Sequence, residues 1–287
     1  MPCNAAESGH EPHRTVMNAS TALPAPPASP APATSPRLQR FDLIPILAIA
    51  AMNLLYGVLG AAAGAVIYLL AMVMTGEAID PATIGTDKNL LQFAIIAAAI
   101  YAAAAILLGA WGIAQWRGLD RRKFGLGRPR HWWWFAIGLA GLAALIGYDY
   151  LAVHLFDPDG AIQARIRRGL LIRSDSLAWA IALWVVAGPL TAAAEELVYR
   201  GLLYRWFRER LPVWIAALAS ALIFGLLHGS LISPGGAMGT AMAVGLVLFG
   251  IVAALLFEAS GSLWPSILIH FVNNSLFVIG AYNPSGG

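Results

Sequence analysis

The sequence predicts an all-α protein, a polytopic bundle of about seven transmembrane helices. Of its 287 residues 59% are hydrophobic and only 11% are charged, whereas a soluble domain carries about 25% charged residues. The mean hydropathy is +0.70. One globular core cannot hide this much apolar surface, so the lipid bilayer is the expected solvent and partner. Apolar runs of about 20 residues without alternation of apolar and polar side chains indicate helices rather than a barrel.

The first 40 residues differ from the rest in composition. Residues 1–40 hold eight of the 17 prolines, mixed with Ala, Ser and Thr. Such a segment cannot build a packed core, so we predict a disordered Pro/Ala-rich tail. A signal peptide is not expected because the first apolar run begins only after about 40 residues, and Met17 is an alternative start. Cys3 is the only cysteine, which excludes an intrachain disulfide and a thiolate metal cluster.

Seven apolar runs follow the tail. The first two predict a pair of N-terminal helices within residues 41–119. The fifth and seventh are less apolar because each contains histidine. The predicted spans are 43–74, 90–116, 132–153, 177–199, 213–228, 238–257 and 263–282.

Basic residues are unequally divided between the two sides of such a bundle. Basic loops stay cytoplasmic, so we predict a cytoplasmic N-terminus and, for these basic clusters, a role in topology rather than in binding nucleic acid. A basic segment at 161–173 predicts an amphipathic helix on the outer surface. One side carries Arg37, Arg40, Arg117, Arg121, Arg122, Lys123, Arg128, Arg130, Arg200, Arg205, Arg208 and Arg210, and the other carries Lys88, Arg165, Arg167, Arg168 and Arg173.

Span four ends in two adjacent carboxylates, Glu195 and Glu196, followed by Arg200. Charges are costly in a membrane helix. Glu196 and Arg200 share a helical face and can form an ion pair. Glu195 is rotated by about 100° from Glu196 and is left for another role. Taken alone, the cluster could equally be an interfacial group that ends the span.

Three further polar side chains lie in the last spans. Span five contains Phe224 and His228 four residues apart, and span seven contains His270 and Asn274 on one face. Each alone could be a structural residue, because Asn and His often bridge membrane helices. Together with Glu195 they supply groups that can activate water and stabilise an oxyanion.

Other chemistries find less support. Ser230 and Ser275 lack a Gly-x-Ser-x-Gly elbow, and neither a His-Glu-x-x-His helix nor a phosphate loop is present. Glu258 has no obvious partner and is a structural candidate, and Asp149 lies near a span end.

The three motifs resemble those of the CPBP family of intramembrane proteases, which includes CAAX prenyl endopeptidases and bacteriocin-processing (ABI) proteins. Glu-Glu-x-x-x-Arg at 195–200, Phe-x-x-x-His at 224–228 and His-x-x-x-Asn at 270–274 occur in order on separate spans. Phe-Gly-Leu at 124–126 and Gly-Ser-Leu-Trp-Pro-Ser at 261–266 also fit. The resemblance covers roughly residues 120–282, which we predict to be the protease core.

The resemblance implies a role for each matching residue. Glu195 would be the general base that activates water, with His228 sharing that water, and His270 and Asn274 would stabilise the oxyanion. Glu196 and Arg200 would support the site as an ion pair, with Phe224 beside them. The substrate would be a membrane-associated peptide or protein, prenylated in the eukaryotic branch. Short loops and an Ala-rich chain favour a bacterial member in the inner membrane.

Two questions stay open at this point. The family has been described as glutamic and as metallo-type; we favour no metal, but Zn²⁺ held by Glu195, His228 and His270 is the alternative. The function could also be non-catalytic, as in a membrane protein that binds peptides or confers bacteriocin immunity. A transporter is disfavoured because no inverted repeat is visible. The sequence gives no indication of the oligomeric state.

Overall fold

The computed structural model describes residues 44–76, 88–116, 125–162, 176–232 and 236–282. The chain divides into two units, residues 1–39 and 40–287, and every described residue lies in the second. The predicted disordered tail and most of the predicted surface helix at 161–173 therefore lie outside the described residues.

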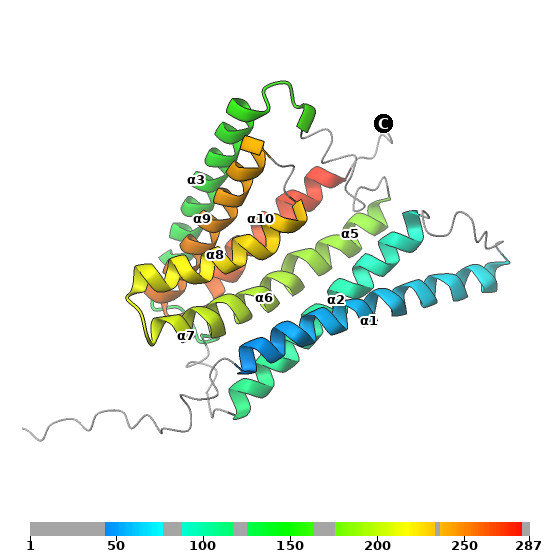
Figure 1. Ribbon diagram of the computed structural model, residues 1–287, viewed down its shortest axis with the longest axis horizontal. Coiled ribbons are helices and arrows are strands. Elements are labelled where there is room, and N and C mark those ends of the chain that lie inside the picture. Colours follow the sequence, from blue (N-terminus) through cyan, green and yellow to red (C-terminus); the bar gives the residue numbers. More distant parts are fainter. Residues whose placement is uncertain (1–43, 77–87, 117–124, 163–175, 233–235, 283–287) are drawn as a thin grey trace, which may run out of the picture. The chain divides into compact units, whose positions relative to one another are not determined.

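Helices make up the described part of the second unit, which confirms the predicted all-α class (Figure 1). Two of the elements, η2 and η3, are π-helical, and they lie within one continuous helical span that also includes α5, α6 and α7. In chain order the elements are α1 (Ile44–Thr75), α2 (Lys88–Trp116), α3 (Trp133–Phe156), α5 (Leu177–Val185), η2 (Val186–Leu190), α6 (Thr191–Glu196), η3 (Leu197–Tyr204), α7 (Arg205–Arg208), α8 (Val213–Ile232), α9 (Gly236–Ser260) and α10 (Trp264–Ala281).

Five helices of the described chain are long and apolar enough to cross a membrane. The fifth and seventh predicted spans correspond to shorter apolar helices, Val213–His228 and Trp264–Gly280. This pattern confirms a polytopic integral membrane protein. The five long spans are Val58–Thr75, Gln92–Gly112, Trp133–Phe156, Leu177–Arg208 and Gly236–Ser260.

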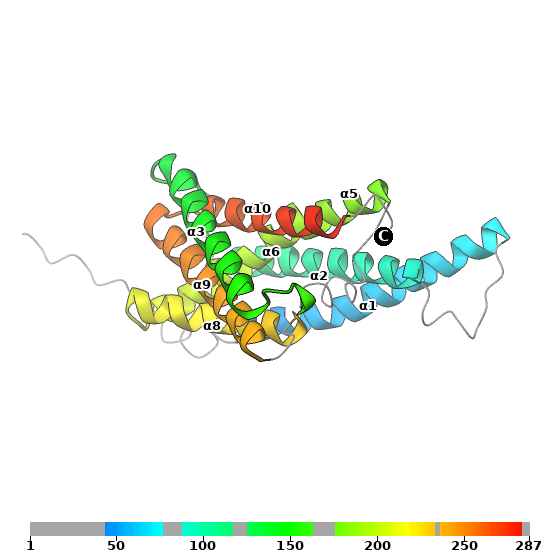
Figure 2. The same ribbon diagram turned by 90° about the horizontal axis from the view of Figure 1, so that it is seen from above.

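The N-terminal helices α1 and α2 lie side by side in both views (Figures 1 and 2). Gly60 and Gly64 form a Gly-x-x-x-Gly motif on α1. A Cβ on either glycine would lie 2.6 Å from a backbone oxygen of α2, that of Ala97 or Phe93. Small residues at this spacing let two membrane helices approach closely, since lipid gives them no hydrophobic drive to associate.

Span four is longer than predicted. It runs continuously from Leu177 to Arg208, a window of 32 residues, whereas the sequence predicted an end near residue 199. The charges of Glu195, Glu196 and Arg200 resemble a helix end in the sequence, but Leu197, Leu202 and Leu203 are buried and continue the helix. The carboxylates therefore lie inside the helix rather than at its end.

The loop before α3 docks on the turn between α9 and α10. Leu263 N–H donates to the Gly125 carbonyl at 2.7 Å, and the Trp264 indole N–H donates to the Leu126 carbonyl at 3.2 Å. Gly125 has a φ of +87°, and a Cβ there would lie 2.6 Å from the ring of Phe257. The two short segments that accompany the three motifs in the sequence are therefore in contact with each other.

Candidate active site

Glu195 and Glu196 lie at the end of α6, between the π-helical segments η2 and η3. Pro189 within η2 lacks an N–H to donate, and π-helical turns commonly absorb such a break at functional sites. The two side chains differ in exposure: Glu195 is 18% exposed, whereas Glu196 is fully buried. The Glu195 side chain is thus partly exposed, and the Glu196 side chain belongs to the core.

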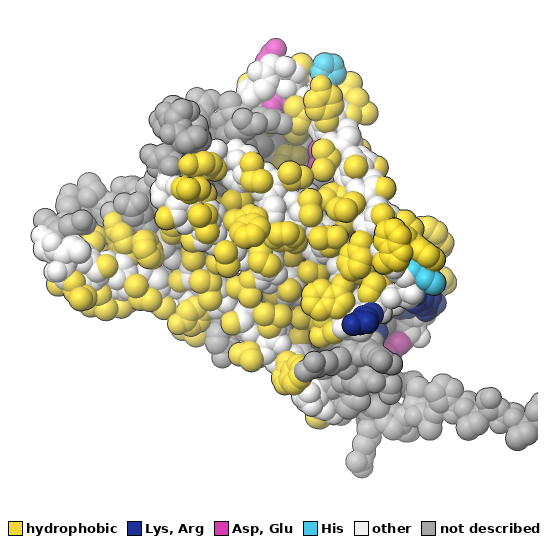
Figure 3. All heavy atoms as spheres, turned by 180° about the vertical axis from the view of Figure 1, so that it is seen from behind, with side chains coloured by type: hydrophobic (Ala, Val, Ile, Leu, Met, Phe, Trp, Pro, Cys, Tyr) yellow, Lys and Arg dark blue, Asp and Glu magenta, His cyan; other side chains and the backbone are white. Residues whose placement is uncertain are grey.

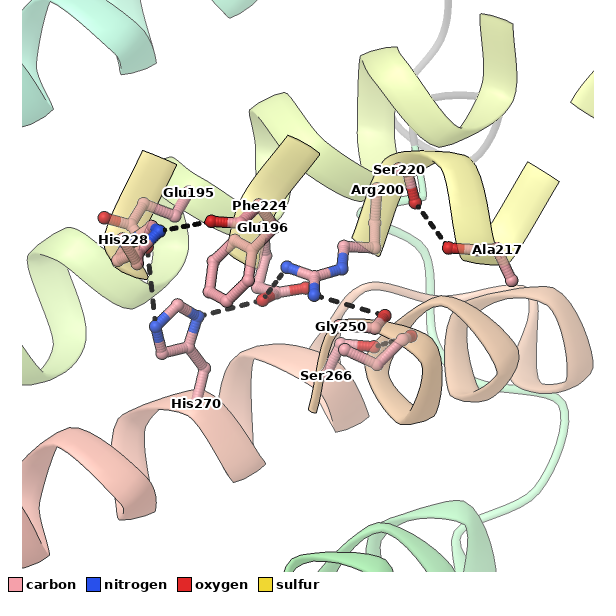
Figure 4. Close-up of polar contacts among 11 residues, drawn as sticks. Glu195, Glu196, Arg200, Ala217, Ser220, Phe224, His228, Gly250, Ser266 and His270 are labelled. Carbon is pink, nitrogen blue, oxygen red and sulfur yellow. Dashed lines mark hydrogen bonds and ion pairs between the residues drawn. The ribbon is translucent and has the colours of Figure 1, made fainter. Parts of the chain in front are cut away.

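Glu196 and Arg200 form the predicted ion pair. Arg200 Nη1 lies 2.7 Å from Glu196 Oε1, and both side chains are buried. Arg200 Nη2 also donates to the Gly250 carbonyl on α9 at 3.3 Å, and the guanidinium lies 4.9 Å from the centre of the Phe224 ring (Figure 4). Arg200 is therefore part of the site, not one of the cytoplasmic loop charges with which the sequence grouped it.

His270 of α10 lies between the two carboxylates. Its Nδ1 is 2.9 Å from Glu196 Oε1, and its Nε2 is 3.5 Å from Glu195 Oε2. Because Glu196 also accepts from Arg200, it is the ionised partner and the His270 Nδ1–H is the donor. The ring of His270 is thereby oriented with Nε2 toward Glu195.

His228 of α8 is the second histidine beside Glu195 (Figure 4). Its Nδ1 lies 2.8 Å from the Phe224 carbonyl, and its Nε2 lies 3.4 Å from Glu195 Oε2. A carbonyl can only accept, so Nδ1 must carry a proton and Nε2 of the neutral ring is an acceptor. Glu195 Oε2 is itself buried and has no hydrogen-bond partner in the described part of the chain.

Asn274 is not directed at this carboxylate cluster. Its Nδ2 donates to the carbonyl of Ala187, in the π-helical segment η2, at 2.7 Å. The next residue, Ser275, accepts a hydrogen bond from the Trp184 indole at 2.9 Å and donates to the Phe271 carbonyl. Two hydrogen bonds thus join α10 to the start of span four just beyond the site.

Glu195, His228 and His270 are the side chains that could hold a metal ion, and they supply the nitrogen and oxygen atoms that zinc accepts. In the described part of the chain, however, no group of three or more His, Cys, Asp or Glu side chains is arranged to hold one. Both histidines face one oxygen of a single carboxylate.

The remaining candidates lie apart from this cluster. Glu258, for which the sequence offered no partner, is bound by two residues: Tyr204 donates to its Oε2 at 2.8 Å, and Arg208 Nε lies 3.0 Å from its Oε1. Asp149 is exposed on α3. The side chain of Ser230 lies outside the described residues, as does Cys3.

Residues 177–276 match the family described as type II CAAX prenyl endopeptidase, Rce1-like. This segment is therefore similar to an Rce1-like domain. The match confirms the resemblance predicted from the three motifs, and it lies within the predicted core, residues 120–282. No curated protein and no solved structure matches the chain. The Rce1-like family implies the activity of a CAAX-type intramembrane protease, and hence of a hydrolase.

None of the three motifs lies on α9, although this helix contributes to the site. Phe249 and Gly250 of α9 contact His270 and Arg200, yet neither was predicted from the sequence. An apolar residue and a glycine inside an apolar span carry no chemical signal, so only the three-dimensional contacts could identify them.

Proposed function

We propose that the protein is an intramembrane endopeptidase in which Glu195 and His228 activate a water molecule and His270 and Asn274 stabilise the oxyanion. The observation that carries the proposal is the convergence of three polar atoms from three helices. Nε2 of His228 and Nε2 of His270 lie 3.4 and 3.5 Å from the same oxygen of Glu195, inside an apolar bundle. Such a cluster is costly in a membrane and is a functional site by default.

The arrangement suits water activation. Glu195 Oε2 and the Nε2 atom of neutral His228 are both acceptors, and a water molecule can donate one O–H to each. Glu195 takes a proton as the water oxygen attacks the scissile carbonyl carbon, and the carbonyl π electrons move to oxygen. The proton then passes to the leaving amine as the C–N bond breaks. The products are one carboxylic acid and one amine, with no other reactant.

Charge balance supports the role of His270. Glu195, Glu196 and Arg200 together carry one net negative charge, which a His270 with both ring nitrogens protonated would neutralise. In that form Nδ1–H donates to Glu196, and Nε2–H is available to the developing oxyanion. Asn274 can be the second donor, because its amide carries two N–H groups and the Ala187 carbonyl accepts only one of them.

The proposed substrate is a membrane-associated peptide or protein, prenylated or not. The experiment that tests the function is a comparison of protein termini in the native host with wild-type protein and with Glu195→Gln. Purified protein should then cleave the substrates so found. Glu258→Gln is the matched control, because it makes the same chemical change in a carboxylate outside the site. A non-catalytic binding or immunity protein predicts the same set of termini in all three strains.

A separate experiment tests whether the activity requires a bound metal. Without a metal, protein that has been exhaustively treated with a chelator should keep full activity, and elemental analysis should find no stoichiometric zinc. Zinc at one atom per chain, with activity lost on chelation and restored by adding zinc, would make Glu195, His228 and His270 metal ligands instead.

We also propose a plasma-membrane location, that of a bacterial inner membrane, with the N-terminus in the cytoplasm. Arg128 and Arg130 precede α3, whereas Asp157 and Asp159 follow it. Figure 3 shows a broad hydrophobic band with the visible Lys and Arg side chains gathered at one end of it, where Asp, Glu and His side chains also lie, whereas the opposite end carries acidic and His side chains.

Cysteine labelling in intact cells tests this orientation. With Cys3 replaced by serine, an impermeant reagent should label Asp159→Cys and should not label Arg128→Cys until the membrane is opened. Both positions are exposed. Gly125 is unsuitable for this purpose, because its backbone conformation and the ring of Phe257 exclude a side chain. Labelling of Arg128→Cys alone would reverse the proposed orientation.

A further inference from the structure

Helix α9 carries none of the three motifs, yet it passes behind the site. Its Gly250 carbonyl accepts a hydrogen bond from Arg200 Nη2 at 3.3 Å. Its Phe249 ring lies 5.2 Å from the ring of His270, centre to centre, at an interplanar angle of 71°. Phe249 is buried. One turn of α9 therefore contacts both the ion pair and the histidine that faces Glu195.

The ring of His270 is held by one hydrogen bond and two aromatic rings. Nδ1 is fixed by Glu196, but a single bond leaves the ring able to tilt about it. Phe249 on one helix and Phe224 on another both contact the His270 ring edge to face, with Phe224 at 6.0 Å and 84°. These two contacts restrict the tilt, and with it the position of Nε2 relative to Glu195.

The close packing of α8 on α9 places Phe249. A Cβ on Gly250 would lie 2.7 Å from Cβ and 2.9 Å from Cα of Ala221 on α8. This approach brings Phe249 against Phe224, with ring centres 6.0 Å apart. The guanidinium of Arg200 lies over both rings, at 4.9 Å from Phe224 and 6.0 Å from Phe249. Phe249 is thus fixed on several sides before it contacts His270.

We propose that Phe249 is a positioning residue of the protease site, which holds the ring of His270 so that Nε2 faces Glu195. The proposal rests on the proposed peptidase function for its kinetic consequence, although not for the contact itself. Phe249 does not touch the reacting atoms. It acts by limiting the orientations of His270, and a misplacement of about 1 Å at a catalytic group can lower turnover about 10²-fold.

The test compares Phe249→Leu with Phe257→Leu. Phe257 lies two turns further along α9, is equally buried, and likewise packs edge to face on an aromatic ring, that of Tyr204, and under an arginine, Arg205. Both variants lose a buried ring from the same helix, so they should lower the midpoint of thermal unfolding similarly. Phe249→Met, which keeps an unbranched apolar chain of similar reach, serves as the milder variant if Phe249→Leu folds poorly.

Two readouts separate positioning from general damage. With a farnesylated CAAX peptide or a substrate from the terminal comparison, Phe249→Leu should lower kcat about 10- to 100-fold with KM nearly unchanged, and Phe257→Leu should leave kcat within about twofold. Nitrogen-15 NMR of histidine-labelled protein in detergent reports His270 without any substrate. Its ring signals, assigned through His270→Gln, should shift or broaden in Phe249→Leu and stay unchanged in Phe257→Leu.

The two readouts distinguish the failure of each proposal. If no peptide is cleaved but the His270 signals respond only to Phe249→Leu, the positioning role stands and the peptidase function fails. Equal loss of kcat in both variants, or His270 signals that are unaffected by Phe249→Leu, overturns the positioning role.

Discussion

Two clusters in this molecule each contain a glutamate–arginine pair, but the two pairs have different surroundings. The inner cluster consists of Glu196, Arg200 and His270, and the rim cluster consists of Glu258, Arg208 and Tyr204. In each, an arginine and a third side chain share one carboxylate. The arginine and glutamate side chains are 1% and 0% exposed in the inner cluster, and 41% and 34% exposed in the rim cluster.

The types of residue in a cluster therefore do not identify a functional site without their burial. Water solvates the partners of an exposed ion pair and screens them, so such a pair contributes little. A buried pair has lost that solvation, and each partner depends on the other. The inner cluster therefore orients His270, whereas the rim cluster only joins the end of α9 to span four.

The largest expected effect is on turnover, and it distinguishes Glu195 from Glu258, the carboxylate of the rim cluster. Glu195→Gln removes the proton acceptor, and loss of a general base costs about 10²–10⁴-fold in turnover. Glu258→Gln should leave turnover unchanged. Initial rates with a common substrate, at equal amounts of folded protein, measure both. Equal activity of Glu195→Gln and wild type would remove Glu195 from the mechanism.

The next effect concerns stability. Arg200→Ala leaves the buried carboxylate of Glu196 without its cation, which costs about 3–5 kcal/mol. The folded yield and the unfolding midpoint in detergent should both fall, and activity should fall with them. Arg208→Ala in the rim cluster should leave the folded yield, the unfolding midpoint and the activity nearly unchanged. A well-folded Arg200→Ala protein with full activity would contradict the assignment of a structural ion pair.

A double variant tests the role of the ion pair between Glu196 and Arg200 further. Removing both charges, with Glu196→Gln and Arg200→Met, should recover much of the stability lost in Arg200→Ala, since no charge remains buried and unpaired. It should not recover activity, because His270 Nδ1 would then face an amide in place of a carboxylate. Recovery of both together would separate the inner cluster from the catalytic chemistry.

Asn274→Ala should lower turnover to an extent comparable with Glu195→Gln, but with a different pattern of kinetic constants. Loss of one oxyanion donor lowers kcat about 10²–10³-fold while substrate binding changes little. Because the amide also donates to the Ala187 carbonyl, some loss of stability should accompany it. Asn274→Asp offers a comparison, since a carboxylate cannot donate to either oxygen. A drop in stability with unchanged kcat would make Asn274 only a link between α10 and η2.

The sequence predicted the parts of the inner cluster that are encoded within one helix. Four-residue spacing was enough to pair Glu196 with Arg200, and that pair is confirmed. It could not predict the contact of His270 with Glu196, which lie 74 residues apart in the chain. The π-helical turns around Glu195 leave no signal that periodicity can detect. The same charges also led to an early predicted end for span four, because local hydropathy cannot distinguish a buried ion pair from an interfacial one.

The smallest expected effect tests the rim cluster directly. Tyr204→Phe removes only the hydroxyl that donates to Glu258 at 2.8 Å, while Arg208 keeps its contact with the same carboxylate. A hydrogen bond to a group that remains paired contributes about 0.5–1.5 kcal/mol, so the unfolding midpoint should fall slightly and kcat should not change. Thermal unfolding in detergent and initial rates measure the two quantities.

The rim cluster is a valid control only if Tyr204→Phe changes stability and leaves kcat unchanged. Tyr204 is fully buried and packs against Phe257, so the phenylalanine ring can take its place without a cavity. A large loss of kcat in Tyr204→Phe would mean that the end of α9 is coupled to the site through η3, the segment that carries both Arg200 and Tyr204. In that case the two clusters would form one network, and exposure would no longer separate the carboxylate that orients His270 from one that only joins two helices.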